Sequence, residues 1–185
     1  MGPPDRKQRF EEIYQAHYPD LLGYVRRRTD SPDDAADALA ETFATAWRRA
    51  DDLPEGEQAR LWLYGVARRV LANQRRGESR RSALAERLRA ELAEWDRTEP
   101  EGPSAPQAVR DAFARLGEAD RELLSLAVWE GLTSGQIATV LGCSGGAARI
   151  RLHRARKRLA AELACAGLDL ARYGARAVAL AKGRP

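Results

Sequence analysis

Basic side chains are concentrated in one short segment near the C-terminal end of the chain. Residues 145–158 (GGAARIRLHRARKR) contain seven basic or potentially basic side chains and no acidic one. At about 100° per residue, a helix over this segment gathers its small and aliphatic residues in one narrow stripe and leaves the opposite face to polar and basic ones. That stripe consists of Ala148, Leu152, Ala155 and Leu159. The pattern predicts noncovalent recognition of DNA, with the stripe packed against neighbouring helices.

The outward face of this predicted helix has the residue types that a major-groove helix needs. Small residues at its N-terminus allow close approach to base edges, while flanking arginines contact phosphates. Arg149 and Arg156 lie on one flank, Arg151 and Arg158 on the other. An ordinary helix with a solvated basic face is the alternative. The predicted DNA-binding residues are Ser144, Gly146, Arg149, Ile150, Arg151, His153, Arg154 and Lys157.

A second helix is predicted immediately before the basic one. Thr133 and Gln136 have the spacing of a capping box, and Gly142 is placed to end the helix. Ile137, Val140 and Leu141 give this helix one apolar face, and Ser144 can cap the basic helix that follows. Two short helices joined at a glycine predict a helix-turn-helix.

Composition limits the remaining function classes. The chain has 185 residues, a net charge of +4 and two cysteines, too few for a disulfide framework or a zinc site, although a redox pair stays open. No apolar run approaches membrane-spanning length, so we expect a cytoplasmic protein. The only histidines are His17 and His153, and no nucleophile or phosphate-cradling motif accompanies them. We therefore expect neither an enzyme nor a bound cofactor or metal.

The chain is predicted to be all-α, with two small helical domains joined by a flexible linker. Residues 97–106 (RTEPEGPSAP) hold three prolines and lack core-forming side chains, and no alternating strand pattern occurs. Residues 80–95 could be helical, but they are heavily charged and are therefore assigned to the connection between the two domains. The predicted ranges are 8–77 for the first domain, 78–106 for the linker, 107–165 for the second domain and 166–185 for a tail.

The first domain is predicted to contain an acidic helix. Residues 10–25 follow a helical period that Pro19 should break or kink, giving two helical pieces. Residues 31–34 (SPDD) then combine a cap, a first-turn proline and acids at the positive helix end. In the helix that follows, Asp37, Glu41 and Arg48 should be exposed. The residues expected to be buried are Ala35, Leu39, Thr42, Phe43, Ala46 and Trp47.

A third helix, over residues 59–76, is predicted to have a basic surface. Leu63, Val66, Ala67 and Val70 should be buried, and Tyr64 and Arg69 should flank the basic side. Basic charge near aromatic rings is typical of single-stranded nucleic acid binding, although Trp47 and Trp62 are expected in the core rather than as base platforms. The residues opposite the buried side are Gly65, Arg68, Ala72, Arg75 and Arg76.

Three segments together resemble the extracytoplasmic-function (ECF) group of bacterial RNA polymerase sigma factors. They are DDAADALAETFATAW, RLWLYGVARRVLANQRR and GLTSGQIATVLGCSGGAARIRLHRARKRL, and the likeness extends over residues 10–163. The resemblance implies a region 2 domain and a region 4 domain that bind core RNA polymerase and promoter DNA. It also implies an anti-sigma factor, often membrane-bound, as a further partner.

The resemblance assigns roles to specific residues. It implies that region 4 recognises the −35 element through the helix-turn-helix, and that the loop over residues 51–58 captures an unpaired base. The −10 element would be approached by Arg68, Arg69, Asn73, Arg75 and Arg76. Core polymerase would be bound through Asp37, Glu41, Thr42, Phe43 and Trp47, with direct contact expected mainly from the two acids.

One departure from the family pattern concerns sequence recognition. Where many members have Thr-Val-Lys/Arg-Ser entering the recognition helix, this chain has Ala147-Ala148-Arg149-Ile150. Ile150 should favour a thymine methyl over polar contact, so the family's −35 preference is not transferred. A stand-alone helix-turn-helix regulator remains the alternative function. A regulator of that kind would have no function for the acidic helix.

Overall fold

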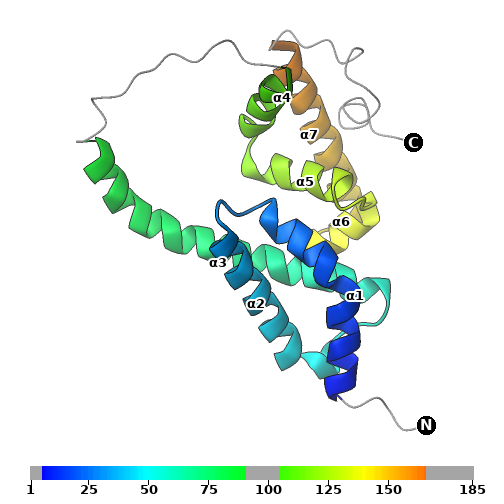
Figure 1. Ribbon diagram of the computed structural model, residues 1–185. Helices are drawn as coiled ribbons and strands as arrows, with labels where there is room; N and C mark the ends of the chain where they lie inside the picture. Colours follow the sequence, from blue (N-terminus) through cyan, green and yellow to red (C-terminus); the bar gives the residue numbers. More distant parts are fainter. Residues whose placement is uncertain (1–5, 91–104, 166–185) are drawn as a thin grey trace. The chain divides into compact units, whose positions relative to one another are not determined.

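The computed structural model describes residues 6–90 and 105–165, in which helices are joined by short turns and no strand occurs. The chain divides into two compact units, Met1–Arg97 and Thr98–Pro185. Unit 1 holds α1, α2, the short 3₁₀ helix η1 and α3, and unit 2 holds α4 to α7 (Figure 1). The bounds are Arg6–Arg26 for α1, Pro32–Arg48 for α2, Ala50–Asp52 for η1, Glu57–Ala90 for α3, Ala105–Ala114 for α4, Glu118–Val128 for α5, Ser134–Leu141 for α6 and Gly145–Cys165 for α7. The all-α prediction is confirmed.

Pro19 does not divide the first helix into two pieces, so the predicted break is wrong. α1 runs without interruption from Arg6 to Arg26, with Pro19 inside it. Proline cannot donate the bond to the carbonyl four residues earlier, which belongs to Gln15. Both Pro19 and Gln15 are exposed, so water can solvate that carbonyl. The cost of the missing bond is therefore small enough for packing of the apolar face to override it.

α2 begins where its sequence predicts. Ser31 has an extended backbone and its Oγ accepts a hydrogen bond from the Asp34 amide at 3.1 Å. Pro32 occupies the first turn, where its missing N–H has no intrahelical partner to lose. Asp33 and Asp34 lie at the positive end of the helix dipole. The start of α2, and thus the rotation of its acidic face, is fixed by local chemistry.

The core of unit 1 contains aromatic side chains from all three long helices. Tyr24 of α1 and Tyr64 of α3 are almost fully buried, with ring centroids 5.0 Å apart. The placement of Tyr64 beside the basic surface is therefore wrong. A second cluster joins Tyr14 to Phe43, at 4.6 Å between ring centroids. These contacts hold α2 and α3 against α1.

α3 is longer than the sequence pattern indicates. The periodic segment was expected to end near Arg76, but the helix continues to Ala90 through the charged residues that were assigned to the connection. Charged residues such as arginine and glutamate have good helix propensity, so loss of the apolar pattern does not itself end a helix. The proposed linker residues 91–104 and the C-terminal tail lie outside the described residues.

Unit 2 packs α4, α5 and α6 against the long helix α7. Its core includes Leu124 of α5 and Ile137 of α6, both fully buried. At the surface, Arg115 donates to Glu162 of α7 at 2.6 Å. This arrangement supports α7 from one side only, and the opposite side is left to solvent.

Candidate functional site

The turn before α7 forms as the sequence predicts. The Thr133 hydroxyl accepts from the Gln136 amide at 3.3 Å, and the Gln136 side-chain oxygen accepts from the Thr133 amide at 2.7 Å. Gly142 ends α6 with a left-handed backbone (φ 65°), which an L side chain rarely adopts. The Ser144 hydroxyl then accepts from the Ala147 amide at 3.2 Å. The predicted helix-turn-helix is confirmed in its capping bonds and its turn.

The buried stripe of α7 also matches its prediction. Ala148 and Ala155 have no exposed surface, and Leu152 and Leu159 are 5% and 2% exposed. Small and large side chains alternate along this stripe, so the preceding helices can approach α7 closely. All eight residues predicted to bind DNA are solvent-exposed, and they are Ser144, Gly146, Arg149, Ile150, Arg151, His153, Arg154 and Lys157.

Two flanking arginines of α7 have surroundings that the sequence pattern does not predict. Arg158 donates to Asp120 of α5 at 2.6 Å, and the Asp120 side chain is only 13% exposed. Arg156 is half-buried, and its Nε has no hydrogen-bond partner among the described residues. Arg158 is thus already paired within unit 2, whereas the phosphate contact expected of Arg156 stays a prediction. Helical spacing could not have shown a partner 38 residues away.

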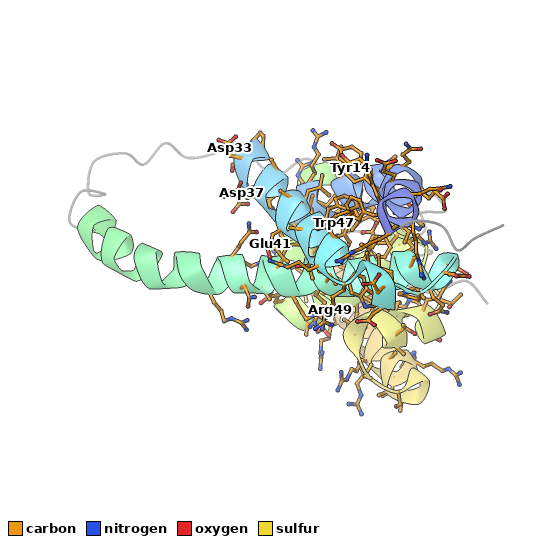
Figure 2. The ribbon with its side chains drawn as sticks, turned by 90° about the horizontal axis from the view of Figure 1, so that it is seen from below. Tyr14, Asp33, Asp37, Glu41, Trp47 and Arg49 are labelled. Carbon is orange, nitrogen blue, oxygen red and sulfur yellow. The ribbon has the colours of Figure 1, made fainter. Side chains whose placement is uncertain are left out.

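On α2, exposed carboxylates form a row. Asp37 and Glu41 are exposed as predicted, and Asp33 extends the row by one further turn (Figure 2). The three residues are spaced by four, so they lie on one side of the helix. Glu41 accepts from Arg48 at 2.6 Å, between side chains that are both more than half exposed. Asp33 was read from the sequence only as a helix-start residue, although the four-residue spacing could have identified it.

The remaining α2 residues of the predicted polymerase motif differ in burial. Thr42 is fully buried and its hydroxyl donates to the Ala38 carbonyl at 2.7 Å. Phe43 is buried as expected, at 6% exposure. Trp47 was expected to be buried but is 41% exposed, because it lies in the last turn of α2 and packs edge-on against Phe10 (ring centroids 5.2 Å apart). Arg6 also lies over the Trp47 ring.

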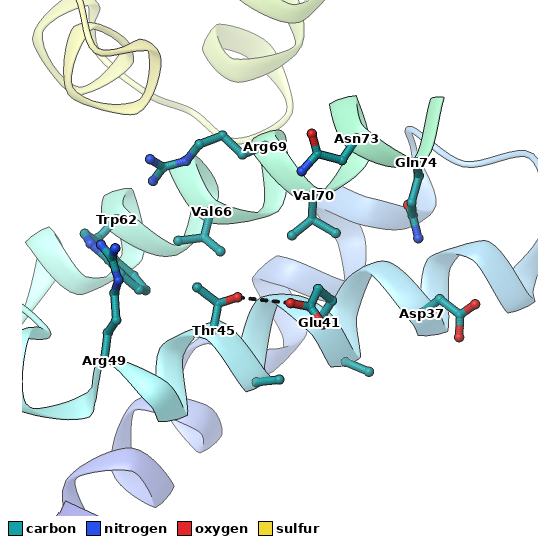
Figure 3. Close-up of a pocket in the computed structure, with 12 residues that line it drawn as sticks. Asp37, Glu41, Thr45, Arg49, Trp62, Val66, Arg69, Val70, Asn73 and Gln74 are labelled. Atoms are coloured by element: carbon teal, nitrogen blue, oxygen red, sulfur yellow. Dashed lines mark hydrogen bonds between the residues drawn. The ribbon is translucent and has the colours of Figure 1, made fainter. Parts of the chain in front are cut away.

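α2 and α3 enclose a groove of about 740 Å³ that joins two of the predicted surfaces (Figure 3). The acids Asp37 and Glu41 line it from α2, and Arg69 and Asn73 line it from α3. The sequence pattern assigned these pairs to different partners and did not place them together. The groove residues that it missed are Ala40, Ala44, Thr45, Arg49, Trp62, Val66, Val70 and Gln74.

Trp62 in the groove is half-buried rather than enclosed in the core. Of the residues predicted to approach the −10 element, Arg68 and Arg76 are exposed and Arg75 is half-buried. Arg69 donates to the Gly65 carbonyl at 3.0 Å, and Arg76 donates to Asn73. Four of the five predicted residues are thus exposed, and two of them, Arg69 and Asn73, also line the groove.

The described part of the chain contains neither a metal cluster nor a membrane-spanning helix. No group of histidine, cysteine and carboxylate side chains there has the arrangement of a metal site. Among the same residues, no helix is both long and apolar enough to cross a bilayer. Cys143 is half-buried and Cys165 exposed, and both are free thiols.

Comparison with known proteins matches both units to one family. The family model of sigma-70 region 2 matches residues 13–81, and that of sigma-70 region 4 matches residues 107–159. The RNA polymerase sigma-E factor of Streptomyces coelicolor is 30% identical over 161 residues, which cover 86% of this chain and 89% of that protein. The ECF RNA polymerase sigma factor SigL of Mycobacterium tuberculosis is 28% identical over 77% of this chain and 82% of its own length.

The chain belongs to the ECF group of RNA polymerase sigma factors. A solved structure of CnrH with the cytosolic domain of CnrY is also similar, at 26% identity and a TM-score of 0.59, over 84% of this chain and 88% of that one. The fold is shared with the sigma factor RpoE of Bartonella quintana, solved with the anti-sigma factor NepR, at 22% identity and a TM-score of 0.60, over 84% of this chain and 96% of that one. In family terms, the helix-turn-helix lies in region 4, and the carboxylate row and the groove lie in region 2.

Proposed function

We propose that this sigma factor binds core RNA polymerase and directs it to promoters, with α7 recognising the −35 element and unit 1 opening the −10 element. The division of α7 into a buried stripe and an exposed basic face carries this proposal. A recognition helix must be held by one side and free on the other, and α7 meets both conditions within a region 4 match.

The exposed residues of α7 divide into two groups by their chemistry. Arg149, Arg151 and Lys157 would contact phosphates and supply salt-sensitive affinity without sequence information. Ile150, His153 and Arg154 would lie against base edges. Ser144 and Gly146 sit where the helix enters the groove, and their small size supports close approach.

The carboxylate row supports a polymerase-binding role for α2. Asp37 and Glu41, with Asp33 added, present three negative charges on an exposed side, and a complementary basic partner surface would pair with them. Thr42 and Phe43 support the row from inside unit 1, since their side chains are buried. Trp47 is exposed enough for its outer edge to contact the partner.

Unit 1 would act on the −10 element through α3. Arg68, Arg75 and Arg76 supply positive charge for the DNA backbone. Arg69 and Asn73 line a groove that also contains Trp62, so polar groups and an aromatic ring are available to an unpaired base there. The loop over residues 51–58, which follows α2, is the family's candidate for capturing such a base.

Regulation would follow the pattern of the structural relative. CnrH is solved with a bound partner, the cytosolic domain of CnrY, and the regulator that we expect here is an anti-sigma factor, at the membrane if it is anchored there. A cytoplasmic, nucleoid-associated protein without catalytic activity, metal or cofactor is part of the same proposal. A stand-alone regulator is not favoured, because the carboxylate row would then have no partner.

Transcription with purified core polymerase tests the proposal. The chain is added to core polymerase and a pool of promoter fragments, and the 5′ ends of the transcripts are mapped. We expect promoter-specific starts only when the chain is present. Tight operator binding by the chain alone, with no effect on start sites, would favour the stand-alone regulator.

A further inference from the structure

Two glycines at the start of α7 are not explained by the fold. A Cβ added to Gly145 or Gly146 would meet no atom within 4 Å, and neither residue has a positive φ. Neither internal packing nor backbone conformation therefore requires glycine here. Glycine also weakens a helix relative to alanine. Two adjacent glycines at such a position point to a requirement outside unit 2.

Ile150 lies one turn after Gly146, on the same outward face. It is 54% exposed, and it is the one aliphatic residue among the exposed large apolar residues in the described ranges. The others are aromatic and contact rings of their own unit: Tyr14 with Phe43, Trp47 with Phe10 and Trp129 with Phe113. A single exposed isoleucine is ordinary by itself. The position of this one, in the second turn of a recognition helix, makes it informative.

The neighbours of Ile150 leave its outer side open. Gly146 lies one turn before it and Arg154 one turn after it, both on the same face. A glycine at the preceding turn removes the side chain that would otherwise hold a DNA surface away from Ile150. His153 and Arg154 are exposed on the C-terminal side, where they can contact other positions.

We infer that Ile150 recognises the 5-methyl group of a thymine in the −35 element, and that Gly145 and Gly146 allow α7 to approach the bases closely enough for this contact. Thymine is the base that presents an apolar group in the major groove, and an aliphatic side chain is its complement. The inference rests on the proposed function and names the chemical group that one residue recognises.

Deoxyuridine tests the contact directly, because it removes only the methyl group. Holoenzyme made from the full chain and core polymerase first selects a promoter from a randomised duplex pool. Each −35 thymine of that promoter is then replaced singly by deoxyuridine, and promoter binding is measured for the wild type, Ile150→Ala and Ile150→Val. At one position we expect deoxyuridine to weaken wild-type binding about three- to five-fold, as for loss of one buried methyl group.

The variants distinguish this contact from a general effect. Ile150→Ala should lose the response to deoxyuridine at that position, while Ile150→Val, which keeps both γ-carbons and loses only the δ-methyl group, should retain most of it. A promoter with no deoxyuridine-sensitive thymine, or an equal loss in Ile150→Ala, overturns the inference alone. A holoenzyme that selects no promoter overturns the proposed function, and this inference with it.

The glycines are tested by Gly146→Ala against Gly135→Ala. Gly135 lies in α6, where an added Cβ would meet only Thr133 Oγ1 at 4.0 Å. Both variants should keep or raise the thermal unfolding midpoint. Gly146→Ala should weaken binding to the selected promoter at least five-fold and Gly135→Ala less than two-fold. Full promoter binding by Gly146→Ala would show that close approach at this point is not required.

Discussion

α7 and α2 each present a charged face, but they separate packing from recognition in different ways. In α7 the buried residues are small or aliphatic, and every predicted DNA-binding residue lies outside the stripe. In α2 the predicted polymerase motif runs through the helix, so it includes the buried Thr42 and Phe43 as well as the exposed Asp37 and Glu41. A sequence motif for a binding surface can therefore include buried residues that hold the helix in place as well as the exposed residues that contact the partner.

The largest effect is expected where the α2 motif enters the core. Phe43→Ala removes a ring that packs against Tyr14, and a buried Phe→Ala change costs about 3–5 kcal/mol. Unit 1 should unfold at lower denaturant concentration, and polymerase binding should fall with it. Chemical denaturation followed by circular dichroism measures the change. An unchanged unfolding midpoint would mean that Phe43 acts at the interface instead.

Removing the exposed acids should weaken polymerase binding without lowering the stability of unit 1. In Asp37→Ala/Glu41→Ala, core polymerase affinity should fall at least ten-fold. The free energy of unfolding should change by less than about 1 kcal/mol, because the exposed Glu41–Arg48 pair contributes little. Fluorescence anisotropy with labelled chain measures the affinity. Glu11→Ala, an exposed acid on α1, is the control and should bind normally.

On α7, two arginines should separate specificity from affinity. Arg154→Ala should reduce discrimination between bases at one promoter position by about 1–3 kcal/mol. Arg151→Ala should weaken binding to all promoters evenly, and the slope of log affinity against log salt concentration should fall by about one. Holoenzyme binding to promoters with single base changes measures both. Equal losses on all sequences for both variants would contradict the division.

Asp120 is expected to keep Arg158 away from DNA. Asp120→Asn should destabilise unit 2 by about 1 kcal/mol, since the lost pair is only partly buried. The freed Arg158 can then reach a phosphate, so holoenzyme binding should depend more steeply on salt concentration. Arg158→Ala is the matched control, with a similar stability loss and no steeper salt dependence. Identical salt slopes for the two variants would argue against this role of Asp120.

The smallest effect concerns pH. Burial lowers the pKa of His17 below its ordinary value of 6.5; Asp20 opposes this shift and Arg60 adds to it. Below pH 6.5 the unfolded chain therefore binds the proton before the folded one does, so unit 1 should lose stability as pH falls. His17→Gln should reduce this slope when unfolding is measured between pH 7 and pH 5. If the substitution leaves this slope unchanged, the pH dependence of stability arises from other groups.

The sequence predicted α7 well because one helical period sets both its packing and its exposure. The same rule failed at Trp47, where the period predicts burial but the helix ends one residue later. The predicted break at Pro19 does not occur, and the local rule cannot show that Gln15, whose carbonyl loses its donor, is exposed to water. The Arg158–Asp120 pair and the α2–α3 groove depend on tertiary packing, which local spacing cannot show.

Separate measurement of polymerase affinity and promoter preference tests the central claim most directly. Asp37→Ala/Glu41→Ala and Arg154→Ala are compared with the wild type in one titration series with core polymerase, and bound promoters are then sequenced. The α2 variant should need more polymerase but select the same promoters, and the α7 variant should bind polymerase normally but select altered promoters. If either variant changed both quantities while remaining folded, the two surfaces would not have separate partners.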